Sequence, residues 1–185
     1  MQKKEISKKK KIVIFIVLIF CLLLVITLKF APNKMTYSIE KQGEKYFVSI
    51  SDNRGTVIYE DLYGSEPIIS KVGKNSIIVT VGGGDFWQSK FINGKTGKVS
   101  ESFENVRAYN EKIVVYGICE EGNLKIVIRD IYNKDEVYKE IIDEFPNIAV
   151  GSYLIKDARV MNNHLVYLNY YLGNDWKTKK KIIFI

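Results

Sequence analysis

A long uncharged segment near the N-terminus is the strongest constraint on this chain. Residues 12–28 carry no charged side chain, and four consecutive lysines, residues 8–11, come directly before them. A helix of that length covers roughly 26 Å at about 1.5 Å per residue, against roughly 30 Å for the hydrocarbon core of a bilayer. The two apolar residues after Lys29 extend the segment. We predict a helix that crosses the lipid bilayer from Ile12 to Ala31.

Two kinds of processing are alternatives to a retained anchor. A cleaved signal peptide has a shorter apolar region and small residues before the cut. The one suitable cut, after Ala31, has Lys29 three positions back and Pro32 directly after it. Lipid modification of Cys21 is the second alternative, but Phe20 stands where lipoprotein signals need a small residue. A buried core helix fits less well because the segment has a single polar residue. We expect an uncleaved signal anchor.

The positive charge of the chain is concentrated around this segment. Residues 1–34 hold eight lysines and one glutamate, and the whole chain has 28 basic and 21 acidic residues, which leaves 20 of each in residues 35–185. The positive-inside rule therefore predicts a basic cytoplasmic tail, residues 1–11, and places residues 32–185 outside the cell membrane. The net charge of +7 indicates attraction to anionic lipid, and we expect no nucleic-acid partner.

Cysteine is rare in the part predicted to face outward. Cys119 is its single cysteine, so no disulfide can form within it, and no Asn-x-Ser/Thr sequon occurs in the chain. The domain must be held by its own core, and a domain of about 150 residues buries close to 70% of its unfolded surface. We expect Cys119 to be partly buried and inert. The composition is typical of a bacterial surface protein.

Residues 35–185 consist of short runs rich in Val, Ile, Tyr and Phe, separated by turn residues. The predicted strands are 36–40, 46–51, 56–61, 68–72, 76–81, 86–92, 98–100, 106–109, 112–116, 124–131, 136–142, 165–171 and 179–185. Strand starts about 8–12 residues apart predict an all-β ectodomain: a sandwich, a barrel or a propeller. The stretch 136–145 also suits a short helix by its charge content.

Three stretches of the predicted domain are similar to one another: 61–68, 91–99 and 130–137. In each, a strand ends in an aliphatic residue, a polar turn follows, and another aliphatic residue comes six or seven places later. Apolar strands precede them at 47–50, 77–81 and 113–116, and another at 165–168 opens a fourth unit. This repeat of roughly 30–45 residues resembles the blades of quinoprotein-like and WD-type β-propellers, although the Trp-Asp and Gly-His signatures are absent. The resemblance implies a small or incomplete propeller; a two-sheet sandwich or barrel is the alternative.

The stretch from Gly82 to Trp87 is the best candidate for a binding site. Its three glycines cost backbone entropy, which indicates an unusual conformation or a mobile connection. The acid and two aromatic residues directly after them can present a ligand surface. We name Gly83, Gly84, Asp85 and Trp87 as candidate binding residues. The alternative is a glycine hairpin with Trp87 packed into the core.

Signatures of catalysis and of metal or cofactor binding are absent from the sequence. His164 is the single histidine, and it stands at the start of a predicted strand, where we expect its side chain to be solvated. No Gly-x-Ser-x-Gly motif accompanies it. Structural zinc sites need four Cys or His ligands. The tripeptide 94–96, Gly-Lys-Thr, lacks the earlier glycine of a phosphate-binding loop. We therefore predict no cofactor, no metal and no catalytic residue.

These observations predict a non-enzymatic, single-pass membrane protein whose outer domain binds a protein, a peptide or a component of the cell envelope. One alternative is a cell-envelope hydrolase that uses a pair of acidic residues, with Asp85 as one of them. Another is an accessory subunit whose anchor packs against a membrane complex, although the anchor lacks a small-xxx-small face.

Overall fold

The computed structural model describes residues 16–17, 19–20 and 35–185, apart from 53, 121–122 and 149. The chain divides into two units, residues 1–32 and 33–185. Most of the predicted anchor and the whole basic tail lie outside the described residues. None of the described helices is long and apolar enough to cross a membrane. Membrane insertion and orientation therefore remain predictions.

In its described residues, the unit 33–185 is built of β-strands and one short 3-10 helix, η1 (Gly151–Leu154). The strands are β1 (Thr36–Gln42), β2 (Lys45–Ser51), β3 (Val57–Tyr63), β4 (Ile68–Val72), β5 (Ser76–Gly83), β6 (Phe86–Asn93), β7 (Phe103–Glu104), β8 (Val106–Tyr109), β9 (Ile113–Glu120), β10 (Asn123–Asp130), β11 (Val137–Ile141), β12 (Ile155–Asn162), β13 (Leu165–Leu172) and β14 (Lys177–Phe184). The predicted all-β class is confirmed for this part of the chain.

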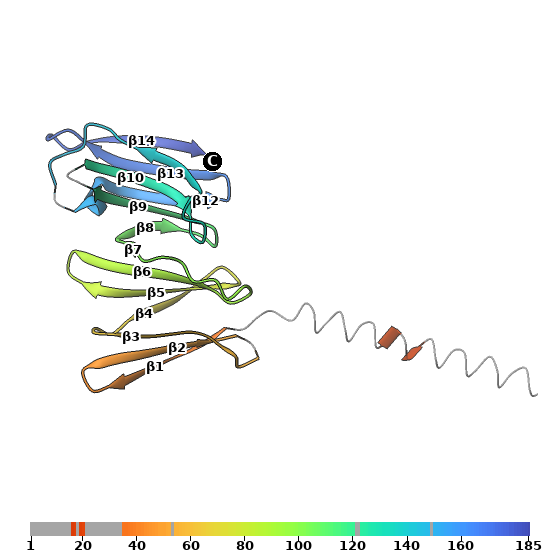
Figure 1. Cartoon of the computed structure of the whole chain (residues 1–185). Helices are drawn as coiled ribbons and strands as arrows, with labels where there is room; N and C mark the ends of the chain where they lie inside the picture. Colours follow the sequence, from red (N-terminus) through yellow and green to blue (C-terminus); the bar gives the residue numbers. More distant parts are fainter. Residues whose placement is uncertain (1–15, 18, 21–34, 53, 121–122, 149) are drawn as a thin grey trace, which may run out of the picture. The chain divides into compact units, whose positions relative to one another are not determined.

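The strands form four antiparallel sheets, each from one continuous stretch of chain (Figure 1). We number them in chain order: sheet 1 is β1-β2-β3, sheet 2 is β4-β5-β6-β7, sheet 3 is β8-β9-β10-β11 and sheet 4 is β12-β13-β14. Strands that pair within a sheet also follow one another in sequence, so each sheet is a meander. Every sheet keeps two open edges, and none is closed.

Three clusters of buried side chains join consecutive sheets. The cluster between sheets 1 and 2 contains Met35, Val48, Ile50, Ile77, Val79 and Ile92. The cluster between sheets 2 and 3 contains Val72, Ile78, Phe91, Phe103, Val114, Tyr116, Val127 and Ile131. The third cluster joins sheets 3 and 4 around Ile113, Val115, Val166 and Leu168. Sheets 2 and 3 are therefore covered on both faces, which explains why their central strands are continuous apolar runs.

The passage from sheet 2 to sheet 3 takes a single residue. β7 pairs with β6, β8 pairs with β9, and Asn105 stands between them. Asn105 has a φ of 47°, in the left-handed region that asparagine tolerates better than most residues. The chain changes sheets at this residue, so Asn105 lies at the boundary of both.

The structure also corrects several predictions. β12, β7 and η1 were not predicted, while residues 98–100 form only an isolated bridge between Val99 and Ile92. The ambiguous stretch 136–145 contains strand β11 and no helix. The expectation of a partly buried Cys119 is wrong: the thiol residue is exposed, because it lies near the end of β9, beyond the part covered by neighbouring sheets.

Candidate functional site

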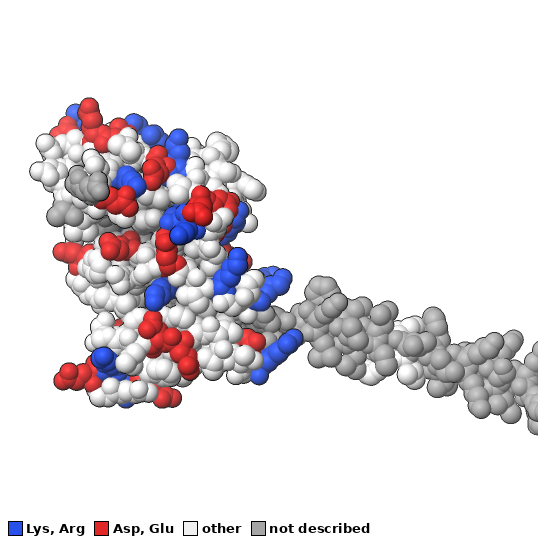
Figure 2. Space-filling view, in the orientation of Figure 1, with Lys and Arg blue, Asp and Glu red and all other residues white. Residues whose placement is uncertain are grey.

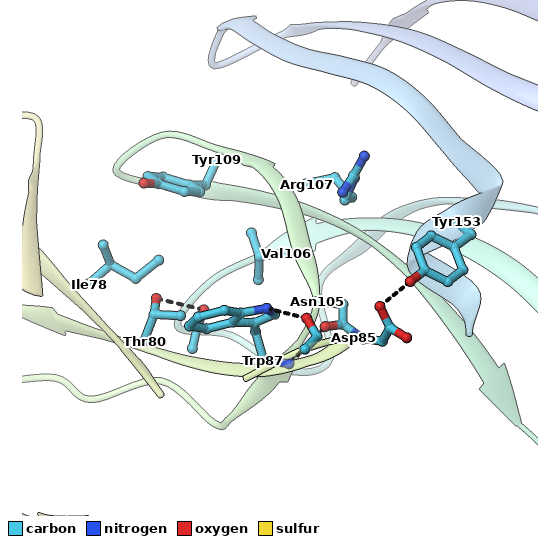
Figure 3. A pocket seen from close by; sticks show the side chains of 11 residues that line it. Ile78, Thr80, Asp85, Trp87, Asn105, Val106, Arg107, Tyr109 and Tyr153 are labelled. Carbon is cyan, nitrogen blue, oxygen red and sulfur yellow. Dashed lines mark hydrogen bonds between the residues drawn. The ribbon is translucent and has the colours of Figure 1, made fainter. Parts of the chain in front are cut away.

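A pocket of about 260 Å³ opens between sheets 2 and 3, beside the β5–β6 hairpin (Figure 3). We call it the Trp87 pocket. Its floor is formed by Thr80, Trp87 and Ser89 of sheet 2. Strand β8 supplies the opposite wall through Val106, Arg107 and Tyr109, and the entrance is flanked by Asp85 and by Tyr153 of η1.

The pocket exists because side chains become smaller along one face of β5. Ile78 fills the space between sheets 2 and 3, but Thr80 and then Gly82 follow on the same face. Thr80 pairs with Ser89 across the sheet, and their hydroxyl oxygens lie 3.0 Å apart. The floor beside Trp87 is therefore both hollow and polar.

The glycines shape the hairpin that carries Asp85. Gly83 pairs with Phe86, which leaves Gly84 and Asp85 as a two-residue turn. Gly84 has a φ of 61° and Asp85 has no positive φ, the pattern of a type II′ turn. Gly82 has a φ of 138°, and a Cβ there would lie 2.2 Å from the carbonyl oxygen of Phe86. Unusual conformations are thus required at Gly82 and Gly84 but not at Gly83.

Trp87 is held firmly but is not a core residue. It is partly buried and belongs to none of the three clusters of the described residues. Its indole Nε1–H donates to the carbonyl of Gly84 at 3.0 Å. Its backbone N–H donates to Oδ1 of Asn105 at 2.8 Å, and its backbone oxygen accepts from the N–H of Asn105 at 2.7 Å. The interpretation of Trp87 as a packed core residue is therefore wrong.

Asp85 and Tyr153 connect the hairpin to η1. The Tyr153 hydroxyl donates to Oδ1 of Asp85, although the two residues are 68 positions apart in sequence. This hydrogen bond raises the pKa of the Tyr153 phenol, because losing the proton would leave two negative oxygens facing each other. The contact closes one side of the entrance to the pocket.

Arg107 supplies positive charge on the opposite wall. It is exposed, and its Nη2 donates to the carbonyl oxygen of Ile155 at 3.0 Å. Within the described residues, its guanidinium makes no other hydrogen bond and no salt bridge. A residue of sheet 4 thus orients this side chain, and most of its donors stay available to a ligand.

A second pocket, of about 200 Å³, lies next to the tip of the hairpin, between Phe86 and residues 117–119 of β9. Asp85 and Asn105 line it too, together with Glu104 and the exposed Cys119. Asp85 and Glu104 are thus two carboxylates facing one hollow. No cluster of three or more His, Cys, Asp or Glu residues in the described part of the chain could hold a metal ion.

Sequence reasoning identified one side of the Trp87 pocket. Gly84, Asp85 and Trp87 line it, while Gly83 does not. It missed Asn105, Arg107, Tyr109 and Tyr153, which come from β8, η1 and the passage between sheets. The only local signal was Asn105 itself, because asparagine tolerates the left-handed conformation of a turn better than most residues.

No protein-family model, no curated protein and no solved structure matches this chain.

Proposed function

We propose that the protein is a non-enzymatic, single-pass membrane protein whose extracytoplasmic domain binds a component of the cell envelope in the Trp87 pocket. The observation that carries this proposal is that Trp87 is held in place by hydrogen bonds and is still partly exposed. One hydrogen bond from its indole orients the ring and two more hold its backbone, yet the residue stays partly exposed and lines the pocket. Rigid, partly exposed aromatic residues are common binding anchors because little conformational entropy is lost when they are covered.

Charged groups on two sides of the pocket support a binding role. Asp85 lies at the entrance and Arg107 on the wall across from Trp87 (Figure 3). Each is already oriented by one hydrogen bond, to Tyr153 and to the carbonyl of Ile155. Such preorganisation lowers the cost of binding. A few oriented polar groups around an aromatic surface are typical of ligand sites.

The predicted anchor gives this pocket its setting. With the basic tail in the cytoplasm, the domain is held at the outer face of the cell membrane. Tethering raises the effective concentration of the pocket toward envelope ligands, so modest affinity is sufficient. Basic and acidic side chains are interspersed over the face drawn in Figure 2, and residues 35–185 hold equal numbers of each. This balance favours a ligand other than nucleic acid.

How the four sheets are arranged, as a propeller or as a sandwich, is part of the same proposal. A small or incomplete propeller is supported by four consecutive meanders, whose central strands β2, β5, β9 and β13 hold the apolar runs of the sequence repeat. A two-sheet sandwich is the alternative. The passage at Asn105 supports it, because strands that switch sheets are a feature of sandwich corners.

Site-specific photo-cross-linking on intact cells tests the binding proposal. In one variant a photoreactive residue replaces Tyr109, which lines the pocket and is 40% exposed. In the control variant it replaces Tyr37 of β1, which is 47% exposed and does not line the pocket. We expect a cross-linked envelope component from position 109 only, and its loss in the Trp87→Ala background. Equal products at both positions, or none at 109, would contradict the proposal. A membrane-protein product would indicate an accessory subunit.

Protease protection tests the predicted topology. Externally added protease should digest residues 35–185 of intact cells and leave a tag at Met1 intact, because six lysines precede the span. Replacing Lys8, Lys9, Lys10 and Lys11 with Glu should weaken or invert this orientation. A domain that is protected on intact cells but cleaved after lysis would show that the orientation is wrong.

The second pocket supports one further candidate, a cell-envelope hydrolase. Asp85 and Glu104 both line that pocket, and glycosidases use two carboxyl groups, one as an acid and one as a base or nucleophile. Full-length protein would then release soluble fragments from isolated envelopes, and both Asp85→Asn and Glu104→Gln would abolish the release. The binding proposal expects no release from any of the three.

A further inference from the structure

We infer that the Trp87 pocket binds one uncharged sugar ring of an envelope glycan. This inference rests on the proposed function and assigns a ligand class to its site. A pyranose ring has apolar faces made of C–H groups and an edge made of hydroxyls. The pocket offers an aromatic surface bordered by polar groups, so the two are complementary in chemistry.

The indole of Trp87 is the aromatic surface available for stacking. Among the described residues, the aromatic ring pairs include Phe91 with Tyr109, at 5.3 Å between centroids, and Tyr171 with Trp176, at 5.2 Å. Trp87 takes part in none of the ring pairs. Its Nε1–H is already bonded to Gly84, so the face of the ring, and not its polar edge, is left for a ligand.

The charge balance of the pocket favours an uncharged ligand. Asp85 and Arg107 contribute one negative and one positive charge. A cation held by aromatic rings would be repelled by Arg107. A phosphate or carboxylate would be repelled by Asp85, and anion sites generally use several cationic or backbone N–H donors. A neutral ligand meets neither repulsion.

The pocket keeps both hydrogen-bond donors and hydrogen-bond acceptors available for a ligand. Oδ1 of Asp85 accepts from Tyr153, and Oδ2 remains an acceptor. The side chain of Asn105 accepts from Trp87 through Oδ1, which leaves its NH₂ group as a donor. Most N–H groups of Arg107 are donors as well. A sugar hydroxyl both donates and accepts, so adjacent hydroxyls match such a mixed set.

The size and shape of the pocket indicate a single ring. Its volume of about 260 Å³ is smaller than the roughly 300–1,000 Å³ of sites for drug-sized ligands. Asp85 and Tyr153, which flank the entrance, are both exposed to solvent. One ring can therefore sit on Trp87 while the neighbouring sugars of the chain continue outside the pocket.

Binding measurements on the full-length protein in detergent micelles test the inference. The probes are neutral oligosaccharides, with tri-N-acetylchitotriose, cellotriose and maltotriose as the first set and an array of neutral bacterial glycans as the second. Uridine is included because a nucleobase can also stack on an indole. We expect at least one oligosaccharide to bind, with saturation transfer strongest at the C–H protons of one ring, and no displacement by uridine.

Variants assign the binding to the pocket. Trp87→Ala should weaken binding by about tenfold or more, as expected for an aromatic anchor. Asp85→Asn, a nearly isosteric change at an exposed position, should weaken it several-fold. Trp176→Ala is the matched control, because Trp176 is 45% exposed and does not line the pocket; its binding should equal that of the wild type.

Three outcomes would overturn the inference. The first is that no oligosaccharide binds at millimolar concentration. If an envelope protein is nevertheless cross-linked at position 109, the proposed function still stands. Binding that survives both Trp87→Ala and Asp85→Asn would place the sugar elsewhere and remove support from the proposed function too. Displacement by uridine would identify the ligand class as nucleosides.

Discussion

The two faces of sheet 2 are built differently, although they share the same strands. Toward sheet 1, β5 presents Ile77 and Val79, which are buried in the first core cluster. Toward sheet 3, the same strand presents Ile78, Thr80 and Gly82, and the space beyond Ile78 becomes the Trp87 pocket. Side chains fill the interface between sheets 1 and 2, but they fill the interface between sheets 2 and 3 over only part of its length. A pocket thus arises where side-chain size falls along a strand, with no change in fold.

The polar groups differ in the same way. At the interface of sheets 1 and 2, Asp61 accepts hydrogen bonds from Tyr59 at 2.8 Å and from Lys90 at 3.0 Å. These groups satisfy one another. At the Trp87 pocket, Asp85 and Arg107 each form one hydrogen bond at the rim and keep further capacity. The first arrangement stabilises the packing of two sheets, and the second is suited to a ligand.

The largest expected effect comes from a residue of the filled part of the interface between sheets 2 and 3. Phe91 is fully buried and packs edge-on against Phe103 and Tyr109. Phe91→Ala should reduce the free energy of unfolding by about 3–5 kcal/mol. Trp87→Ala, from the same strand and face, should cost only about 1 kcal/mol because Trp87 is partly exposed. Urea denaturation measures both; equal losses would mean that Trp87 is a core residue.

The hairpin glycines give the next largest effect. Gly82→Ala forces a side chain into a positive φ and against the Phe86 carbonyl, so we expect a loss of about 2 kcal/mol or more. Gly83→Ala is the matched control: its φ is ordinary and no atom lies within 4 Å of the added Cβ. Its unfolding free energy should change by less than about 0.5 kcal/mol. If the two variants are equally stable, the hairpin geometry differs from that described.

Acid should weaken the interface of sheets 1 and 2 by a smaller amount. Burial alone would raise the pKa of Asp61, but the hydrogen bonds from Tyr59 and Lys90 outweigh it and lower the pKa below its ordinary value of 3.8. The stabilisation is therefore complete above that ordinary value and is lost as pH falls through the lower, folded-state pKa. Because Asp61 is partly exposed, we expect about 0.5 kcal/mol.

The comparison for this acid effect is Asp61→Asn. The unfolding free energy is measured between pH 5 and 2, a range that includes the ordinary pKa of Asp61. The variant should lack the contribution of Asp61 to the pH dependence in this range. Asp85→Asn should not remove this contribution, because Asp85 lies at the pocket and not between sheets 1 and 2. An acid transition of wild-type shape in Asp61→Asn would show that the Asp61 network contributes nothing.

The smallest effect is spectroscopic. The hydrogen bond to Asp85 raises the pKa of Tyr153, and the positive charge of Arg107 opposes this. The two substitutions should therefore act in opposite directions: Asp85→Asn should lower the pKa of Tyr153 toward its ordinary value of 10.0, and Arg107→Gln should raise it further. Titration of ¹³Cζ-labelled tyrosine followed by NMR measures both. Shifts of the same sign would contradict the arrangement of the entrance.

The sequence allowed the central strands to be predicted well. The apolar runs at 77–81 and 113–116 are in β5 and β9, which are covered on both faces. β12 was missed because charged residues such as Asp157 and Arg159 alternate with its small apolar ones. They lie on the face of sheet 4 opposite to the core cluster, and no other sheet of the described residues covers that face. Its assignment as a strand depends on pairing with β13.

By itself, the sequence determined the properties that depend on local pattern. Alternating and continuous runs of β-branched and aromatic residues set the all-β class, and the three glycines before Asp85 set the hairpin, because backbone preference and burial act over a few residues. Only the tertiary structure decided the Trp87 pocket. Its walls come from β5, β6, β8 and η1, and the contact of Asp85 with Tyr153 spans 68 residues. Such contacts depend on how sheets 2 and 3 stack, and no local pattern encodes that stacking.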